Sequence, residues 1–426
     1  MCLNPISLPL LTGSSAAVIP CGKCAECLQK KSNELTVRTV REVQYYGDFY
    51  LVTLTYNQAS VPIALTEFQT EVDFDGNVNH IPTYIEVLRK SKSSRFCRMC
   101  CSAYRQRFLD DCEKRWVTKE DTGDQVQQYQ PLYFMDHDGK FKCLYWTVDS
   151  YDFQRIMKKA RMRWFRKYDK PFPDFKYLAV PEYGGTTYRP HIHCLFLGLK
   201  REHIDFISKI WNDEMGTVDI RQVGYSMEDY TKVSHYVSAY ANKGQYDCEF
   251  IKDGICKTPR KMISNCFGIG NPDDFRRLES WLKCEDIYGE YDQDDIENNP
   301  QKDEIVQDVM SRRYYEVNGY KYPLPQYIKQ KIFFKYEDYE KGLDTETGEI
   351  EVGRHQVATA LQHLVTNAIF EHLRRDFDFE LQSSAEACKA LGIVPYEVSD
   401  SIVDSQKNKA AAIEKNFITK IKHSKL

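Results

Sequence analysis

Two β-type segments joined by a glycine pair constrain the fold of this chain more than any other feature. Residues 175–180 and 191–199 are rich in apolar, β-branched and aromatic side chains, and Gly184-Gly185 lies between them. This pattern predicts an antiparallel hairpin with a connection longer than the tightest turns. A further aromatic and β-branched run at residues 49–56 predicts a buried strand. An antiparallel sheet is therefore the expected core of the protein.

The second arm of the hairpin carries two candidate metal ligands. His191 and His193 alternate with Ile192, so both imidazoles are expected on one face of the strand. Glu182 lies nine residues before His191, on the other arm, and could supply a carboxylate at the same level. Two imidazoles and one carboxylate leave coordination positions open, which metal-ion catalysis requires. The alternative is that both histidines are ordinary surface or core residues.

A predicted helix opening at Ser226 carries a stripe of reactive side chains. Tyr236, Tyr240 and Lys243 are spaced by four and three residues, which places them on one helical face. A tyrosyl oxygen can attack a phosphate, although a phenol with a pKa near 10 needs a metal or a cation to act as phenolate. The alternative is that the tyrosines pack as core and Lys243 lies at the exposed end.

Length and composition set the outer limits. The chain has 426 residues, a mass of 50.0 kDa and a net charge of -4, which favours two to three domains and gives no global nucleic-acid signal. The charge is uneven, because residues 155–170 carry eight Lys/Arg and one acid, whereas residues 285–304 carry nine acids and one base. No apolar run approaches the roughly 18 residues of a membrane span, so we expect a protein without a membrane segment.

The cysteines favour a reducing compartment. There are 15 of them in a chain too large to need disulfide staples. Cys2 with Cys21, Cys24 and Cys27 forms a four-thiolate set with tight C-x2-C spacing, which predicts a structural zinc site. Buried thiols and an iron–sulfur cluster are the alternatives.

Three motifs together resemble those of a known family. The sequence is similar to the HUH endonucleases, and more closely to the rolling-circle replication initiators (Rep) of microviruses, the small single-stranded-DNA phages of the gokushovirus type. The matching segments are Val52–Tyr56, Arg189–His193 and Tyr236–Lys243, with further likeness at Pro20–Cys27 and Gly319–Pro325.

The resemblance implies an α+β fold with a central five-stranded antiparallel sheet and flanking helices. It implies that Tyr236 or Tyr240 takes the 5′-phosphate of a nicked origin strand, and that the other tyrosine serves strand joining. Glu182 matches the family's third metal ligand, beside the two histidines, and Lys243 matches its phosphate-side cation. Mg²⁺ or Mn²⁺ is the implied catalytic ion. The implied partners are single-stranded origin DNA and a host helicase and polymerase, in the cytoplasm of a host bacterium.

The expected organisation has four parts. A Cys-rich segment spans 1–48, an endonuclease domain 49–270 with an insertion at 57–148, an acidic loop with an aromatic and basic extension 271–353, and a C-terminal helix with a Lys-rich tail 354–426. The acidic stretch 285–304 predicts a solvated loop, and residues 354–375 predict an amphipathic helix. DNA binding is assigned to the basic helix predicted over 152–167 and to the strand before the histidines, through Arg155, Lys158, Lys159, Arg163 and Arg189.

Two other function classes compete with nicking. Gly185-x5-His191-x-His193 imitates the start of a cupin metal-oxygenase motif, but Leu197 and Gly198 stand where that motif needs a glutamate. A non-catalytic single-stranded-DNA-binding protein would keep the basic helix and the cysteines and give the tyrosine stripe no chemical role. The chain has no Gly-x4-Gly-Lys-Ser/Thr loop, so unwinding is expected to come from another protein.

Overall fold

The computed structural model describes residues 6–9, 16–19, 21, 24–72, 77–88, 98–119, 122–222, 232–234, 249–256, 258–317, 319–343, 350–369 and 371. These residues form two compact units. The central-sheet unit is Tyr46–Phe267, and the terminal unit combines the described residues up to Tyr45 with those from Gly268 onward. Within the described ranges, no helix has the length and apolar character that crossing a membrane requires.

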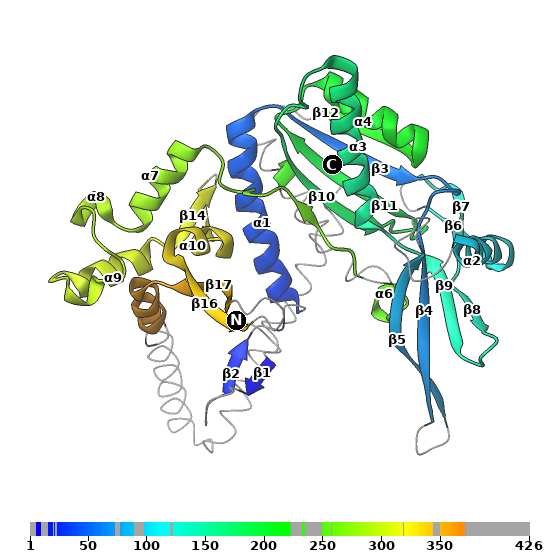
Figure 1. Cartoon of the computed structure of the whole chain (residues 1–426), viewed down its shortest axis with the longest axis horizontal. Helices are drawn as coiled ribbons and strands as arrows, with labels where there is room; N and C mark the ends of the chain where they lie inside the picture. Colours follow the sequence, from blue (N-terminus) through cyan, green and yellow to red (C-terminus); the bar gives the residue numbers. More distant parts are fainter. Residues whose placement is uncertain are drawn as a thin grey trace, which may run out of the picture. The chain divides into compact units, whose positions relative to one another are not determined.

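A five-stranded sheet organises the central-sheet unit (Figure 1). Its order is β12-β3-β11-β10-β13, and every neighbouring pair is antiparallel. The strands are β3 (Phe49–Tyr56), β10 (Lys176–Tyr183), β11 (Pro190–Leu197), β12 (Gly216–Gln222) and the two-residue β13 (Met262–Ile263). The predicted hairpin and the predicted antiparallel sheet are confirmed, with strand ends shifted by one to three residues.

Two helices cover one face of this sheet. They are α3 (Ser150–Tyr168) and α4 (Arg201–Glu214), close to the predicted bounds (Figure 1). Asp149 caps the start of α3 by accepting a hydrogen bond from the Tyr151 backbone N–H, and Asp169 ends it in a left-handed conformation. The rings of Phe153 on α3 and Phe196 on β11 stack at 6.3 Å, so the even-numbered residues of β11 face the helices. Side-chain alternation therefore turns His191 and His193 to the opposite face.

Residues 57–148, expected as an insertion, build a second sheet on the same hydrophobic core. Its order is β5-β4-β9-β8, and the buried residues Ile63, Leu144 and Trp146 belong to the cluster that also holds Ile192 and Phe196. Its strands are β4 (Ile63–Val72), β5 (Val78–Leu88), β8 (Leu132–Met135) and β9 (Phe141–Trp146). The same stretch contains α2 (Arg98–Asp111) and the paired strands β6 (Lys114–Thr118) and β7 (Gln125–Tyr129), and α6 (Glu249–Lys252) follows later in the unit.

The terminal unit is built from short helices and strand pairs around a second core. Its buried residues include Leu282, Ile305, Ile328, Phe333 and Leu361. Its helices are α1 (Ala25–Tyr46, whose last residue falls in the other unit), α7 (Pro272–Leu282), α8 (Glu285–Tyr288), the 3-10 turn η1 (Ile296–Asn298), α9 (Lys302–Ser311) and α10 (Gln326–Phe333). Its strand pairs are β1 (Ile6–Pro9) with β2 (Ala16–Ile19), β14 (Tyr314–Val317) with β15 (Tyr320–Pro323), and β16 (Phe334–Leu343) with β17 (Ile350–Ala358).

Two sequence-based expectations for this unit are wrong. The acidic stretch 285–304 is not a solvated loop, because it contains α8, η1 and the start of α9, and Ile296 is fully buried among the acids. Residues 354–358 belong to a strand rather than to a helix, because β17 pairs with β16 and Arg354 forms a 2.8 Å ion pair with Asp338. Helix begins only at residue 360, after Thr359, whose hydroxyl accepts a hydrogen bond from the Gln362 backbone N–H.

A buried ion-bearing pair on α1 fixes a glycine loop of the terminal unit. Arg41 donates to the carbonyls of Gly268 and Ile269 at 3.1 and 2.7 Å. Glu42 accepts from the backbone N–H groups of Gly268 and Gly270 at 2.6 and 3.2 Å. Buried charges are tolerated only when they are hydrogen-bonded in this way, so the loop and the helix stabilise each other.

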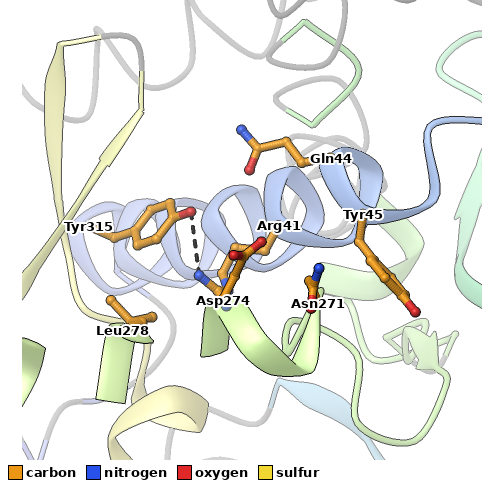
Figure 2. Close-up of a pocket in the computed structure, with 7 residues that line it drawn as sticks. All are labelled: Arg41, Gln44, Tyr45, Asn271, Asp274, Leu278 and Tyr315. Carbon is orange, nitrogen blue, oxygen red and sulfur yellow. Dashed lines mark hydrogen bonds between the residues drawn. The ribbon is translucent and has the colours of Figure 1, made fainter. Parts of the chain in front are cut away.

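A cavity of about 400 Å³ lies beside this pair. Figure 2 shows Arg41 between Tyr315 and α7, with its guanidinium donating to the Tyr315 hydroxyl at 3.5 Å. The cavity is lined by Arg41, Gln44, Tyr45, Asn271, Asp274, Leu278 and Tyr315. Its lining mixes one cation, one acid, amides and phenols, so no single ligand chemistry follows from it.

Candidate functional site

The hairpin brings the three predicted metal ligands together. Glu182 pairs directly with His191 in the β10–β11 register. The Nε2 atom of His191 lies 3.0 Å from Oε1 of Glu182 and 3.0 Å from Nε2 of His193. The Nε2 atom of His193 lies 3.5 Å from the same carboxylate oxygen. Local strand pairing therefore converges one ligand atom from each residue on one point.

The other ring nitrogen of each histidine has its own partner. His191 Nδ1 lies 3.1 Å from the Arg189 carbonyl oxygen, and His193 Nδ1 lies 3.1 Å from Oγ1 of Thr53 on the neighbouring strand β3. A carbonyl oxygen can only accept, so His191 carries its proton on Nδ1 and presents a lone pair at Nε2. The same arrangement at His193 makes Thr53 the residue that orients the second ligand. Sequence reasoning assigned no role to Thr53, although it lies in the first motif.

The carboxylate is held ionised in a buried position. Burial raises the pKa of Glu182, but hydrogen bonds and charge interactions with His191 and His193 outweigh it and lower the pKa to about 2. The Glu182 side chain is 5% exposed, and its Oε2 atom has no hydrogen-bond partner in the described part of the chain. A buried carboxylate oxygen without a partner is costly unless a cation or another donor completes it.

These observations fit a divalent cation. Ligands at about 2.1 Å in neighbouring positions of an octahedron lie about 3.0 Å apart. The spacings of 3.0, 3.0 and 3.5 Å among the three ligand atoms are close to that value. The unpartnered Oε2 atom of Glu182 supplies a further acceptor. Three protein ligands leave positions for water or a phosphate oxygen, which is the arrangement of a catalytic rather than a closed structural site.

The predicted nucleophiles Tyr236 and Tyr240, with Lys243, lie outside the described residues. The described part of their predicted helix is 232–234, and it is helical. Val233 and Ser234 are fully buried there. The placement of the three reactive side chains stays a prediction.

An acidic side chain partly neutralises the predicted DNA-binding helix. Glu214, the last residue of α4, forms ion pairs with Arg155, Lys159 and Arg163 at 3.6, 2.5 and 3.0 Å. Burial raises the pKa of Glu214, but its hydrogen bond to Lys159 and these three cations lower it overall. Lys158 is exposed on the same helix. The helix also covers the sheet face opposite to His191, so its cations do not share a surface with the metal ligands.

The fifth predicted DNA-binding residue lies at the hairpin. Arg189 donates to the Tyr56 carbonyl oxygen through Nε and Nη2 at 3.2 and 2.8 Å, and its guanidinium lies 5.5 Å from the Trp146 ring. Tyr183 is buried and its hydroxyl lies 3.0 Å from the Thr147 hydroxyl. Arg189 therefore ties the hairpin to β3, and Tyr183 packs rather than presenting a ring for base stacking.

A second group of ligand-type side chains lies in the terminal unit. The sulfur atoms of Cys21, Cys24 and Cys27 lie within 4.8 Å of one another. Cys2, the fourth residue of the predicted set, lies outside the described residues.

Comparison with known protein families gives a match over the hairpin. Residues 140–245 match the family model of the replication-associated protein ORF2. No curated protein and no solved structure matches the chain. The matched segment contains β10, β11 and all three converging ligands, and it extends over the predicted tyrosine helix. Over this segment the chain belongs to the replication-associated protein ORF2 family.

Proposed function

We propose that the chain is a metal-dependent, site-specific endonuclease and strand transferase that nicks single-stranded DNA at a phage replication origin. The observation that carries the proposal is the convergence of Glu182, His191 and His193 on one face of a strand pair within the family-matched segment. The five-stranded antiparallel sheet supports an HUH endonuclease fold. Replication-associated proteins act on DNA, which makes origin DNA the proposed substrate.

The residues of the described site would hold Mg²⁺ or Mn²⁺. A bound divalent cation supplies Lewis-acid polarisation of the scissile phosphate. Glu182 contributes negative charge, since its pKa is lowered to about 2 and it is ionised at neutral pH. Thr53 and the Arg189 carbonyl fix the two imidazole rings, so the ligand set needs little rearrangement on binding.

The proposed covalent step uses a tyrosine. The hydroxyl oxygen of Tyr236 or Tyr240 attacks phosphorus, the P–O3′ bond breaks, the phenolic proton passes to solvent, and the leaving 3′-oxygen takes up a proton from solvent. The product is a 5′-phosphotyrosine and a free 3′-hydroxyl that primes synthesis. Lys243 is proposed as the cation that lowers the pKa of the nearer phenol. The second tyrosine reverses the chemistry, because the phosphotyrosine keeps the bond energy for joining.

The proposed DNA contacts are the exposed cations of α3, among which Lys158 has its side chain in solvent. Arg155, Lys159 and Arg163 retain a net positive charge after their pairing with one carboxylate, Glu214. A host helicase and polymerase in a bacterial cytoplasm are the proposed partners of the nicked product.

The experiment that tests this function is trapping of a covalent adduct. The full chain is incubated with labelled single-stranded origin DNA and Mn²⁺ and run on a denaturing gel. We expect an adduct with the wild type and with the control Tyr336→Phe, whose ring is 61% exposed. We expect none with the double variant Tyr236→Phe/Tyr240→Phe. Binding without any adduct in the wild type would instead identify a non-catalytic single-stranded-DNA-binding protein.

A further inference from the structure

Three cysteines gather at the start of α1, away from the hairpin ligands in sequence and in a different unit. Their sulfur atoms lie within 4.8 Å of one another. The backbone N–H of Cys24 donates to the sulfur of Cys21 at 3.3 Å. Such a bond favours the charged form of the sulfur, because a thiolate is the stronger acceptor.

The position of the cluster also favours thiolates. Cys24 directly precedes α1, and its carbonyl accepts the hydrogen bond from Leu28 N–H that opens the helix. Cys27 lies in the first turn and is buried. The partial positive charge at a helix N-terminus stabilises nearby anions. Two independent features, the N–H···S bond and the helix end, therefore act on the same cluster.

The sequence of α1 explains why an anchor at this end matters. Its middle is rich in β-branched residues, which have low helix propensity. These are Thr36, Val37, Thr39, Val40 and Val43, all fully buried or nearly so. The hydroxyls of Thr36 and Thr39 donate to carbonyls four residues earlier, at 3.0 and 2.8 Å. Forming the first turn is the unfavourable step in helix formation, and a group that fixes that turn removes the cost.

We propose that Cys21, Cys24 and Cys27 bind a structural Zn²⁺ ion, with Cys2 as the fourth ligand, and that this ion fixes the first turn of α1. Tetrahedral Zn–S bonds of about 2.3 Å place sulfur atoms about 3.8 Å apart, within the observed spacing limit of 4.8 Å. Each coordinating thiol releases one proton to solvent, and no electron is transferred. Zinc rather than Mg²⁺ or Mn²⁺ is the ion for such a site, because thiolates are soft ligands.

The test is metal analysis of the full chain after exhaustive dialysis against buffer with a weak chelator. We expect about one zinc per chain in the wild type, and less than a tenth of that in Cys24→Ser/Cys27→Ser. The matched control is Cys266→Ser, a partly exposed thiol outside the cluster, which should retain full zinc. Cys2→Ser should retain zinc at first and lose it to a strong chelator at least tenfold faster than the wild type.

Further readouts separate this site from the hairpin site and from other ligands. His193→Ala should keep its zinc, so a failure of the proposed nicking activity would leave this result intact. Cobalt substitution should give the visible absorption of a tetrahedral thiolate site. A zinc-free, folded wild type, bound iron and sulfide, or full zinc in Cys24→Ser/Cys27→Ser would each overturn the proposal.

Discussion

Replacing Thr53 by valine removes the hydroxyl that orients His193 and keeps the shape of the side chain. The Thr53 Oγ1 atom lies 3.1 Å from His193 Nδ1, and the two residues pair directly across β3 and β11. Without that partner the His193 ring loses its fixed proton position and its rotational restraint. Loss of such an outer contact typically weakens metal binding 10–100-fold, or about 1.4–2.8 kcal/mol.

The assay is direct Mn²⁺ binding followed by the Mn²⁺ dependence of adduct formation. We expect the half-saturating Mn²⁺ concentration of Thr53→Val to rise about 10–100-fold, with adduct yield recovering at high Mn²⁺. The matched control is Thr55→Val on the same strand and the same face. The Thr55 residue pairs with His191, but its hydroxyl makes no hydrogen bond within the described ranges, so its Mn²⁺ affinity should change less than threefold, or about 0.7 kcal/mol. Equal affinities for Thr53→Val and the wild type would refute the orienting role.

Two further predictions concern the terminal unit. Burial, with the nearby Arg313 and Lys30 charges, lowers the pKa of Lys329 from 10.5 to about 8, so the folded state binds fewer protons than the unfolded state between these values and stability rises with pH across that window. Lys329→Met should therefore raise the urea midpoint at pH 7, by up to about 3 kcal/mol of unfolding free energy, and the gain should shrink toward pH 10.5; an equal gain at both pH values would contradict the assignment. Gly270→Ala should destabilise the unit more than Gly289→Ala, because both glycines have positive φ but a Cβ at Gly270 would lie 2.8 Å from the Arg41 carbonyl oxygen, whereas nothing lies within 4 Å at Gly289. The difference between their urea midpoints should correspond to about 1–3 kcal/mol, and equal midpoints would show that the loop yields freely.

The ligand set could be predicted from the sequence because it depends on local pairing. Side-chain alternation places His191 and His193 together, and a hairpin connection brings Glu182 opposite His191. Thr53 is different, because it is 140 residues away from His193 in the chain and only the order of strands in the sheet brings it close. The pairing of Glu214 with three cations of α3 likewise depends on how two helices pack, which charge counting along the chain does not reveal.

The errors in the terminal unit have a physical cause. Counting charges over 285–304 predicted a loop, but a single apolar residue such as Ile296 is enough to fix a short turn on a core. The apolar spacing after residue 354 suits a helix, yet the preceding β16 offers a strand partner, and the hydrogen-bonded ladder takes residues 350–358. In both places tertiary packing overrides the local pattern.

The most direct test of the central claim is adduct formation by His193→Ala, measured beside its affinity for single-stranded DNA. The imidazole of His193 is one of the converging ligands, whereas DNA affinity is proposed to depend on cations elsewhere. The account predicts that the variant binds the origin strand within about threefold of the wild type, or about 0.7 kcal/mol, and forms no adduct with Mn²⁺. Undiminished Mn²⁺-dependent adduct formation by His193→Ala would contradict it.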